Sequence, residues 1–381
     1  MRIFSKRVAL VLASAAALGL LVSGCAGTDG SDDASPTTSG SVDSSQVDEI
    51  LAPYVGQASA FPVDEPLART PEGGTIAYLQ CATPFCAIFA NLLAPAAEEL
   101  GVDLTVTKAD SSASGLQRAA ETIISQKPDA VIVAGTDPAA IKNQLATLED
   151  SGTPVLSNGA IDASSYGIDV GFNDTAAMEV VGSVLAAWAI KERGAEANAV
   201  FYTTPELVFS GKIEDAFTST YAELCPDCKV RVKDIPVASI GSTAPAEVVS
   251  DLQANPDTNL AIFATEEAAT GLPAQLKVAG LSDQVLVNGF GATPAQLEEI
   301  QDGELAGSMA VDVPVIMWSL VDAAARLMTD QPLTAGEESG IPPLELVDAS
   351  SLEGKDVTNG YSAYPDFAEQ FATLWSGSGG N

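Results

Sequence analysis

The sequence predicts an α/β protein built from two doubly wound lobes, each with a parallel sheet between two layers of helices. From about residue 74, short runs of apolar, β-type residues alternate with segments whose apolar residues recur at helical spacing. The same alternation repeats after residue 173. Repeated strand–helix units form parallel sheets with helices on both faces. Two successive runs in a chain of this length therefore predict two lobes.

The first run predicts four strands, at 75–79, 104–107, 130–134 and 154–156. The helix after the first strand is indicated by Phe89, Leu92 and Leu93, which lie three and four positions apart. Asp137 and Pro138 predict the start of the third helix, as an N-cap followed by a first-turn proline. Gly152 predicts its end.

The second run predicts five strands, at 199–202, 230–235, 260–263, 285–287 and 305–310. It opens with a helix whose apolar face contains Met178, Val181 and Leu185. Thr293 and Pro294 predict the start of another helix, because threonine is a frequent N-cap and proline fits the first turn. A long helix follows over about 317–327.

The amino-terminal residues are typical of an export signal. Basic residues at positions 2, 6 and 7 precede an apolar run at 8–22, which predicts a signal peptide over 1–24. Residues 21–25, Leu-Val-Ser-Gly-Cys, resemble the bacterial lipobox, in which the cysteine is lipidated. We therefore expect a lipid on Cys25, which would hold the protein at a membrane. Ordinary cleavage beside an incidental cysteine is the alternative.

The remaining flanks carry weaker patterns. Residues 25–46 are almost entirely Gly, Ser, Thr, Asp and Ala, so we expect a lipidated N-terminus followed by a flexible tether. Residues 47–72 predict a lead-in segment with a short helix, and 344–347 a strand. A tail at 351–381 contains a short helix with Phe367, Phe371 and Trp375. Both flanks are expected to pack on the lobes.

Charge and composition exclude several functions. The chain has 17 Lys and Arg against 51 Asp and Glu, a formal charge of −34, which argues against nucleic acid or anionic lipid as a partner. The lipid anchor is the only membrane contact expected. The chain contains no histidine, so it has no Ser-His-Asp triad and no His-ligated zinc site. No nucleotide-binding glycine motif is present, and we expect no cofactor.

Four of the five cysteines group by proximity into Cys81 with Cys86 and Cys225 with Cys228. In an exported protein this even number predicts two disulfides. Cys225 and Cys228 also have the spacing of a redox motif. They end a helical pattern, however, whereas a thioredoxin-like site opens a helix.

Ligands of parallel sheets bind beyond the carboxyl ends of the strands. In two facing lobes these ends predict a shared ligand cleft. The loops concerned are 80–86, 108–112, 135–138 and 157–162 in the first lobe, and 203–211, 237–243, 264–270 and 290–293 in the second.

The order of elements resembles the type 1 periplasmic binding proteins, the sugar-binding receptors of ABC importers. The resemblance covers about 73–335 and rests on five short stretches in the right order: 83–85, 126–133, 151–155, 289–294 and 302–308. It implies two hinged lobes that close on a ligand. It also implies a sugar or polyol as ligand, an ABC permease as partner, and a monomer.

Several of the family's ligand positions differ in this chain. The polar residue before Pro-Phe is Thr83, and the first-helix aromatics fall on Phe85 and Cys86, so the second aromatic is missing. A bridge between Cys81 and Cys86 would stiffen this lip instead. The family's Asp-Arg pair falls on residues 159–160, which leaves Asn158 as the nearest polar group.

Several of the family's ligand positions in the second lobe also differ in this chain. The family's arginine at the start of the second helix has no counterpart, and Lys212 is the nearest cation. An asparagine is replaced by Glu266, and an aspartate by Gly291. The polar residue of the last crossover falls on Asp312.

Sugar sites need carboxylates and amides for the hydroxyls and an aromatic face for the C–H side of the ring. The candidate ligand contacts are Gln80, Thr83, Phe85, Asp110, Asp137, Asn158, Asn173, Phe209, Lys212, Glu266, Phe290 and Asp312. Asp137 and Asn173 are also suited to capping a helix, which is the competing interpretation for them.

We interpret the chain as an extracytoplasmic solute-binding lipoprotein on the outer face of the cell membrane, and not as an enzyme. The alternatives are a ligand sensor that presents to a membrane kinase, and a carbohydrate-active enzyme using Glu266 and Glu267. The predicted lobes are 73–172 with about 313–332, and 173–312 with about 333–350.

Overall fold

The computed structural model describes residues 42–81, 84–110 and 112–376. The predicted signal peptide and Cys25 lie outside the described residues. The strands are β1 Thr75–Gln80, β2 Asp103–Lys108, β3 Ala130–Ala134, β4 Val155–Asn158, β5 Val170–Phe172, β6 Asn198–Thr203, β7 Lys229–Asp234, β8 Leu260–Phe263, β9 Leu286–Gly289, β10 Ser308–Val311 and β11 Leu344–Val347. The α-helices are α1 Ser44–Leu51, α2 Pro84–Leu100, α3 Ala113–Gln126, α4 Lys142–Ser151, α5 Thr175–Arg193, α6 Val208–Leu224, α7 Ala244–Ala254, α8 Leu272–Ala279, α9 Pro294–Gln301, α10 Val313–Met328, α11 Ala335–Ser339 and α12 Phe367–Ser376.

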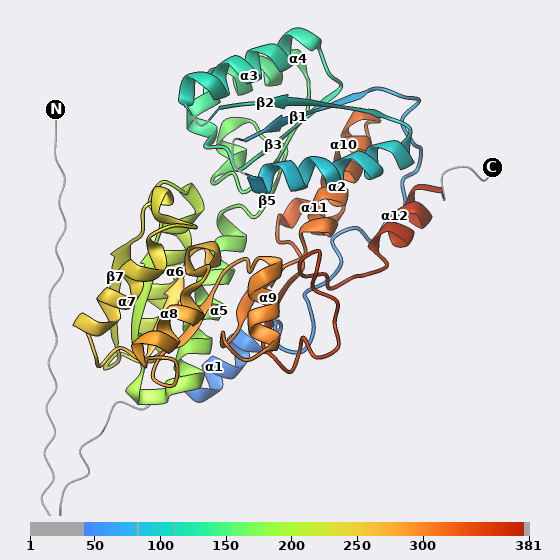
Figure 1. Ribbon diagram of the computed structural model, residues 1–381. Helices are drawn as coiled ribbons and strands as arrows, with labels where there is room; N and C mark the ends of the chain where they lie inside the picture. Colours follow the sequence, from blue (N-terminus) through green and yellow to red (C-terminus); the bar gives the residue numbers. More distant parts are fainter. Residues whose placement is uncertain (1–41, 82–83, 111, 377–381) are drawn as a thin grey trace, which may run out of the picture. The chain divides into compact units, whose positions relative to one another are not determined.

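The first lobe is a parallel sheet with strand order β2-β1-β3-β4-β5. Its central strand β3 is fully buried, with the sequence Ala-Val-Ile-Val-Ala. Such a continuous apolar run suits a strand covered on both faces. Helices α2 and α10 pack on one face and α3 and α4 on the other (Figure 1).

The second lobe contains a parallel sheet with strand order β7-β6-β8-β9. A bridge between Phe290 and Met309 continues it to the antiparallel pair β10–β11. Helices α5 and α6 cover one face, and α7, α8 and α9 the other. Both lobes therefore have the predicted doubly wound α/β architecture.

The predicted strands at 130–134 and 260–263 are confirmed residue for residue. The predicted strand at 305–310 begins only at Ser308. The chain at the preceding Gly307 approaches Val347 so closely that a Cβ would lie 2.5 Å from its carbonyl oxygen. Pro138 begins a 3-10 turn, and α4 follows at Lys142. β5, α8 and α11 were not predicted from the sequence. Strand β5 has only three residues and contains a glycine.

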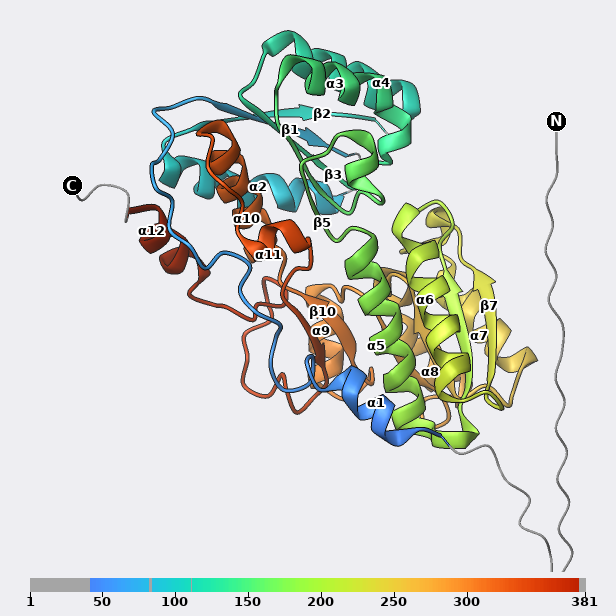
Figure 2. The ribbon, with the colours of Figure 1, turned by 180° about the vertical axis from the view of Figure 1, so that it is seen from behind.

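The flanks pack on the lobes as expected. Helix α1 packs beside α5 (Figure 2). Val55 forms a bridge with Leu346 of β11. Helix α12 packs on the first lobe, where the rings of Trp375 and Trp318 stack with centroids 5.4 Å apart. Within the described residues, no helix combines the length and the apolar character needed to cross a membrane.

Candidate functional site

The carboxyl end of the first sheet places an amide pair at the exit to the second lobe. Asn158 ends β4, and its Oδ1 accepts a hydrogen bond of 2.9 Å from Nδ2 of Asn173, which follows β5. Asn173 has a left-handed backbone (φ 54°), a conformation that asparagine tolerates better than most residues. Its Oδ1 is buried without a hydrogen-bond partner in the structure. Asp174, and not Asn173, caps α5.

The neighbouring loop is shaped by the first disulfide, which joins Cys81 after β1 to Cys86 in α2, as the sequence predicted. Gly135, in the loop after β3, has φ 58°, and a Cβ there would lie 3.3 Å from Sγ of Cys81. The disulfide thus supports the loop that contains Asp137. Gln80 is buried at the end of β1. Thr83 lies outside the described residues, and for Phe85 only its place in the first turn of α2 is described.

Two predicted contacts of the first lobe have local partners instead. Asp110 is exposed, and its carboxylate accepts hydrogen bonds from the backbone N–H and hydroxyl of Ser112. These hydrogen bonds, together with Arg118 at 3.0 Å, lower the pKa of Asp110. Asp137 is exposed and caps the 3-10 turn through the N–H of Ala139. Both residues still lie at the carboxyl edge of the sheet.

An aromatic pair forms at the corresponding edge of the second lobe. Phe209, in the first turn of α6, and Phe290, after β9, meet edge to face with centroids 6.3 Å apart. Phe209 is half-buried and Phe290 is 9% exposed. The structure therefore brings these two predicted contacts together.

One ion pair connects the two edges. Nζ of Lys212, in α6, lies 3.9 Å from Oδ1 of Asp162, which follows β4 in the first lobe. The same carboxylate oxygen accepts a hydrogen bond from Thr175. Asp162 lies in the predicted 157–162 loop but was not among the candidate ligand contacts. A carboxylate at the end of a loop after a buried strand is the sequence feature that could have indicated it.

Glu266 lies inside the second lobe. Its side chain is 0% exposed, and both carboxyl oxygens lack a hydrogen-bond partner in the structure. The side chain packs against Gly289, where a Cβ would lie 3.2 Å from that of Glu266. The pKa of Glu266 is raised to about 8, chiefly by burial, with Ser308 opposing the rise and the nearby Glu299 adding to it. In this conformation the carboxyl group is enclosed and does not reach the surface.

Asp312 is likewise 0% exposed, at the crossover from β10 to α10. One carboxylate oxygen caps α10 through the N–H of Val315. The other accepts hydrogen bonds from the N–H groups of Ala363 and Tyr364, at 2.7 and 3.2 Å. Burial raises the pKa of Asp312, and these hydrogen bonds oppose the rise. The side chain thus connects the start of α10 to residues 362–364.

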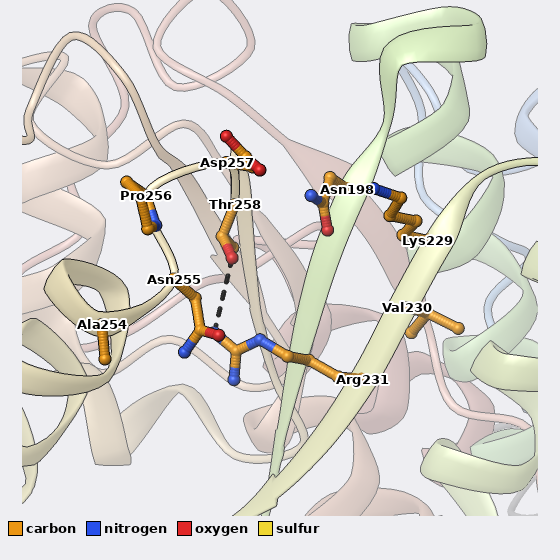
Figure 3. Close-up of a pocket in the computed structure, with 9 residues that line it drawn as sticks. All are labelled: Asn198, Lys229, Val230, Arg231, Ala254, Asn255, Pro256, Asp257 and Thr258. Carbon is orange, nitrogen blue, oxygen red and sulfur yellow. Dashed lines mark hydrogen bonds between the residues drawn. The ribbon is translucent and has the colours of Figure 1, made fainter.

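The second lobe also has a groove of about 500 Å³ at the opposite, amino ends of its strands, bordered by Asn198, Lys229, Arg231 and Thr258 (Figure 3). Arg231 donates a hydrogen bond to Thr258 and pairs with Asp251 at 2.6 Å. The groove lies at the far end of the sheet from the aromatic pair. Among the described residues, no group of three His, Cys, Asp or Glu side chains is arranged to hold a metal ion.

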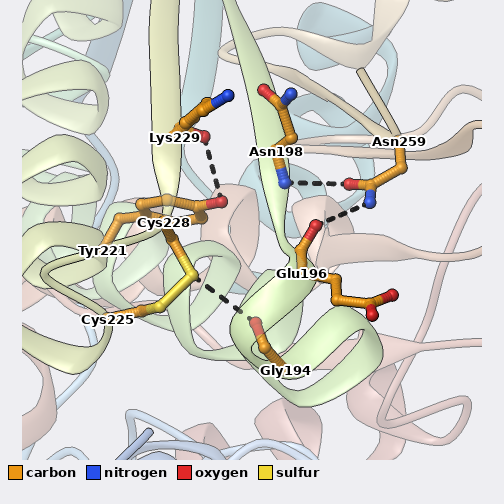
Figure 4. The surroundings of a disulfide bond; sticks show 8 residues. All are labelled: Gly194, Glu196, Asn198, Tyr221, Cys225, Cys228, Lys229 and Asn259. Atoms are coloured by element: carbon orange, nitrogen blue, oxygen red, sulfur yellow. Dashed lines mark hydrogen bonds between the residues drawn. A yellow bond between two sulfur atoms is a disulfide. The ribbon is translucent and has the colours of Figure 1, made fainter. Parts of the chain in front are cut away.

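The second disulfide, between Cys225 and Cys228, closes the turn from α6 to β7, as predicted (Figure 4). Cys225 is the C-cap of α6, and Sγ of Cys228 lies 3.5 Å from the carbonyl of Gly194. A helix carboxyl end disfavours a thiolate, whereas reactive CxxC cysteines sit at amino ends. The position argues for a structural bridge.

The two doubly wound lobes, with polar and aromatic side chains at facing strand ends, define the class of bilobal binding proteins. The model of the periplasmic binding protein domain family matches residues 77–332, and the chain belongs to this family. The comparison with curated proteins finds no match.

Solved structures show the same fold. An ABC transporter solute-binding protein from Agrobacterium vitis with bound allitol has a TM-score of 0.64 and 20% identity, over 74% of this chain and 97% of that one. A periplasmic solute-binding protein from Actinobacillus succinogenes with bound D-allose has a TM-score of 0.62 and 20% identity, over 73% and 99%. The binding protein of the arabinose ABC transporter from a Shewanella species has a TM-score of 0.63 and 16% identity, over 79% and 97%. The family and these neighbours are binding proteins and not enzymes, which confirms that part of the interpretation.

Proposed function

We propose that this protein captures a neutral sugar or polyol between the carboxyl edges of its two lobes and delivers it to an ABC permease. The observation that carries the proposal is the pair of Phe209 and Phe290, which offers an aromatic surface at the edge of the second lobe. The amides of Asn158 and Asn173 offer donors and acceptors for hydroxyl groups at the edge of the first. Aromatic faces with a few polar groups are the usual lining of such sites.

The solved neighbours support this ligand class, since their structures hold allitol and D-allose. The proposed contacts are Gln80, Asn158, Asn173, Phe209, Lys212 and Phe290, with Thr83 and Phe85 retained from the sequence pattern. Lys212 and Asp162 neutralise each other, which leaves the amides and rings to select an uncharged ligand.

We further propose that the mature protein is a monomer held outside the cell membrane by a lipid on Cys25. The basic and apolar start of the chain and the Leu-Val-Ser-Gly-Cys sequence support this anchor. Labelling of producing cells with an alkyne palmitate analogue tests it. Wild type is expected to carry the label and Cys25→Ser to lack it. Equal labelling of both would rule out Cys25 as the lipidated residue.

The lobe division is also a proposal. We assign 73–172 with about 313–332 to the first lobe, and 173–312 with about 333–350 to the second. The packing of α10 in the core of the first lobe and the pairing of β11 with β10 support it. Arg326 of α10 pairs with Glu337 of α11, so we place α11 with the first lobe and the return to the second lobe at 340–343.

A thermal-shift screen of the chain from residue 25, with Cys25→Ser, tests the ligand class. Sugars, polyols, amino acids, polyamines and nucleosides are compared at equal concentration. A ligand that binds only the folded state raises Tm by mass action. We expect a hit among the neutral sugars or polyols. A hit only among amino acids, polyamines or nucleosides would contradict the proposal.

A matched pair of variants then tests the site. Phe209→Leu keeps apolar bulk but removes the ring face, and we expect about tenfold weaker binding of the identified ligand, or about 1.4 kcal/mol. Tyr54→Leu is the control, because Tyr54 is also a half-buried aromatic packed on the same core, away from the proposed site. Equal affinities in both variants, by calorimetry, would remove Phe209 from the site.

A further inference from the structure

Within residues 42–376, as far as the structure describes them, the chain passes between the two lobes five times. Two of these passages follow β5 at Asn173 and β10 at Asp312. A third, at 340–343, leads from α11 back to β11. The other two belong to the flanks: residues 59–62 lead from the second lobe into the first, and residues 362–364 lead from Tyr361, in the core of the second lobe, to Phe367, on that of the first. The passages at 59–62, 340–343 and 362–364 lie outside the residues that the family model matches.

Hydrogen bonds join these passages to one another. The N–H of Asn173 donates to the carbonyl of Gly340 at 3.1 Å, and that of Asp312 to the carbonyl of Pro343 at 3.0 Å. The N–H of Ser59 donates to the carbonyl of Leu344 at 3.0 Å, and the hydroxyl oxygen of Ser59 accepts from the N–H of Leu344 at 3.0 Å. The hydroxyl of Tyr364 donates to the carbonyl of Ser59 at 2.9 Å.

Asp312 adds a further link between the passages. Its second carboxylate oxygen accepts hydrogen bonds from Ser362, Ala363 and Tyr364, so the crossover of the matched domain is joined to the carboxyl-terminal flank. The ring of Tyr364 packs edge to face on Phe61 of the amino-terminal flank, with centroids 5.1 Å apart. Each passage is therefore joined to at least one other.

Such links oppose independent motion of the passages. A hinge moves when a few residues change their backbone dihedrals. Here the residues at the passages also hold hydrogen bonds to other passages, and a large rotation would break several partly buried hydrogen bonds together. An enclosed donor or acceptor left without a partner is costly, so the links favour one lobe arrangement.

We propose that Asp312 is a positioning residue, which clasps the carboxyl-terminal flank to the second crossover and thereby restrains the opening of the two lobes. The clasp consists of Asp312, Ser362, Ala363 and Tyr364. This inference goes beyond ligand capture, and its test needs no ligand, so it can fail or succeed whatever becomes of the proposed function.

The test measures the distance between the lobes in the ligand-free protein by pulsed electron paramagnetic resonance. The chain from residue 25, with Cys25→Ser, carries spin labels at Glu99→Cys in α2 and Val278→Cys in α8, both exposed positions. The four native cysteines are held in disulfides. We expect a narrow distance distribution for this parent, and a broader one shifted to longer distances for Asp312→Ala.

Two further variants separate the clasp from stability in general. Asp312→Ser keeps a hydroxyl that can cap α10 but has no second oxygen for residues 362–364, and it should broaden the distribution even if Asp312→Ala fails to fold. Thr293→Ala removes an N-cap within the second lobe, at a helix that takes no part in the passages, and should lower Tm without broadening the distribution. The proposal is overturned if folded Asp312→Ala or Asp312→Ser gives the distribution of the parent.

Discussion

The first lobe, with its crossover at Asp312, and the core around Glu266 in the second lobe both enclose carboxyl groups, but these groups differ in their partners. Asp312, at the crossover, and Asp322, in α10 of the first lobe, are 0% exposed, and both oxygens of each accept hydrogen bonds. In the second lobe, Glu266 is equally enclosed with neither oxygen partnered, and the nearby Asn288 has an unpartnered Nδ2. Asp312 and Asp322 thus form hydrogen bonds that join separate chain segments. The carboxyl group of Glu266 is enclosed by the core of the second lobe and forms no hydrogen bond with it.

This difference teaches where an acidic side chain stabilises the structure. A buried carboxylate with charged or N–H partners recovers part of what it loses in hydration. A buried carboxyl group without partners stays neutral instead, because burial opposes its ionisation. Removing a partnered buried carboxylate should therefore lower the free energy of unfolding strongly at any pH. For a buried carboxyl group without partners, the contribution to the free energy of unfolding should depend on pH.

The largest effect is expected from Asp322→Ala. Oδ2 of Asp322 lies 2.5 Å from Nε of Arg326, and Oδ1 accepts from the indole N–H of Trp375. Arg326 is 2% exposed, so the variant leaves a buried cation with only Glu337 as a carboxylate neighbour. We expect a loss of about 3–5 kcal/mol in the free energy of unfolding, measured by urea unfolding with circular dichroism.

The control for this variant is Lys191→Ala, which removes the exposed ion pair with Asp48 and should change stability little. If Asp322→Ala lost no more than Lys191→Ala, the first lobe would not depend on this buried carboxylate for stability, and the comparison would fail.

The next largest effect is expected in the second lobe, where the free energy of unfolding should depend on pH through Glu266. The pKa of Glu266 is raised from 4.5 to about 8 in the folded state. Between these values the folded protein holds a proton that the unfolded protein has lost, so the free energy of unfolding falls as pH rises. The slope is at most about 1.4 kcal/mol per pH unit. Stability from this group is complete below about pH 4.5 and is lost as pH rises through 8.

Glu266→Gln keeps the shape of the side chain and cannot lose the proton. We expect wild type to lose about 2 kcal/mol more than Glu266→Gln between pH 6 and pH 8, by urea unfolding at each pH. Other raised carboxyl groups, such as Glu337, are present in both proteins and cancel in the difference. Parallel stability profiles for the two proteins would mean that Glu266 is hydrated or partnered in solution.

The sequence predicts the fold well where the signal is local. The strand at 130–134 is marked by five apolar residues in a row, and the cap at Thr293 by the proline after it; the structure confirms both. The partners of Asp312 at residues 362–364 lie about 50 residues away along the chain, so no local sequence pattern predicts them. For the same reason, the sequence selected Glu266 and Asp312 from their loops without indicating that both side chains are enclosed.

Two capping boxes provide the finest comparison between the regions. Thr293 with Gln296 caps α9 in the second lobe, and Thr334 with Glu337 caps α11 of the first lobe. Thr293→Ala removes only a cap, and we expect a loss of about 1 kcal/mol in the free energy of unfolding. The hydroxyl of Thr334 also donates to the carbonyl of Pro62 at 2.8 Å, so Thr334→Ala should cost about 2 kcal/mol. Urea unfolding of the two variants side by side measures the difference. Equal losses would indicate that the hydrogen bond to the amino-terminal flank adds nothing to stability, and that this flank is held to the lobes by its apolar contacts instead.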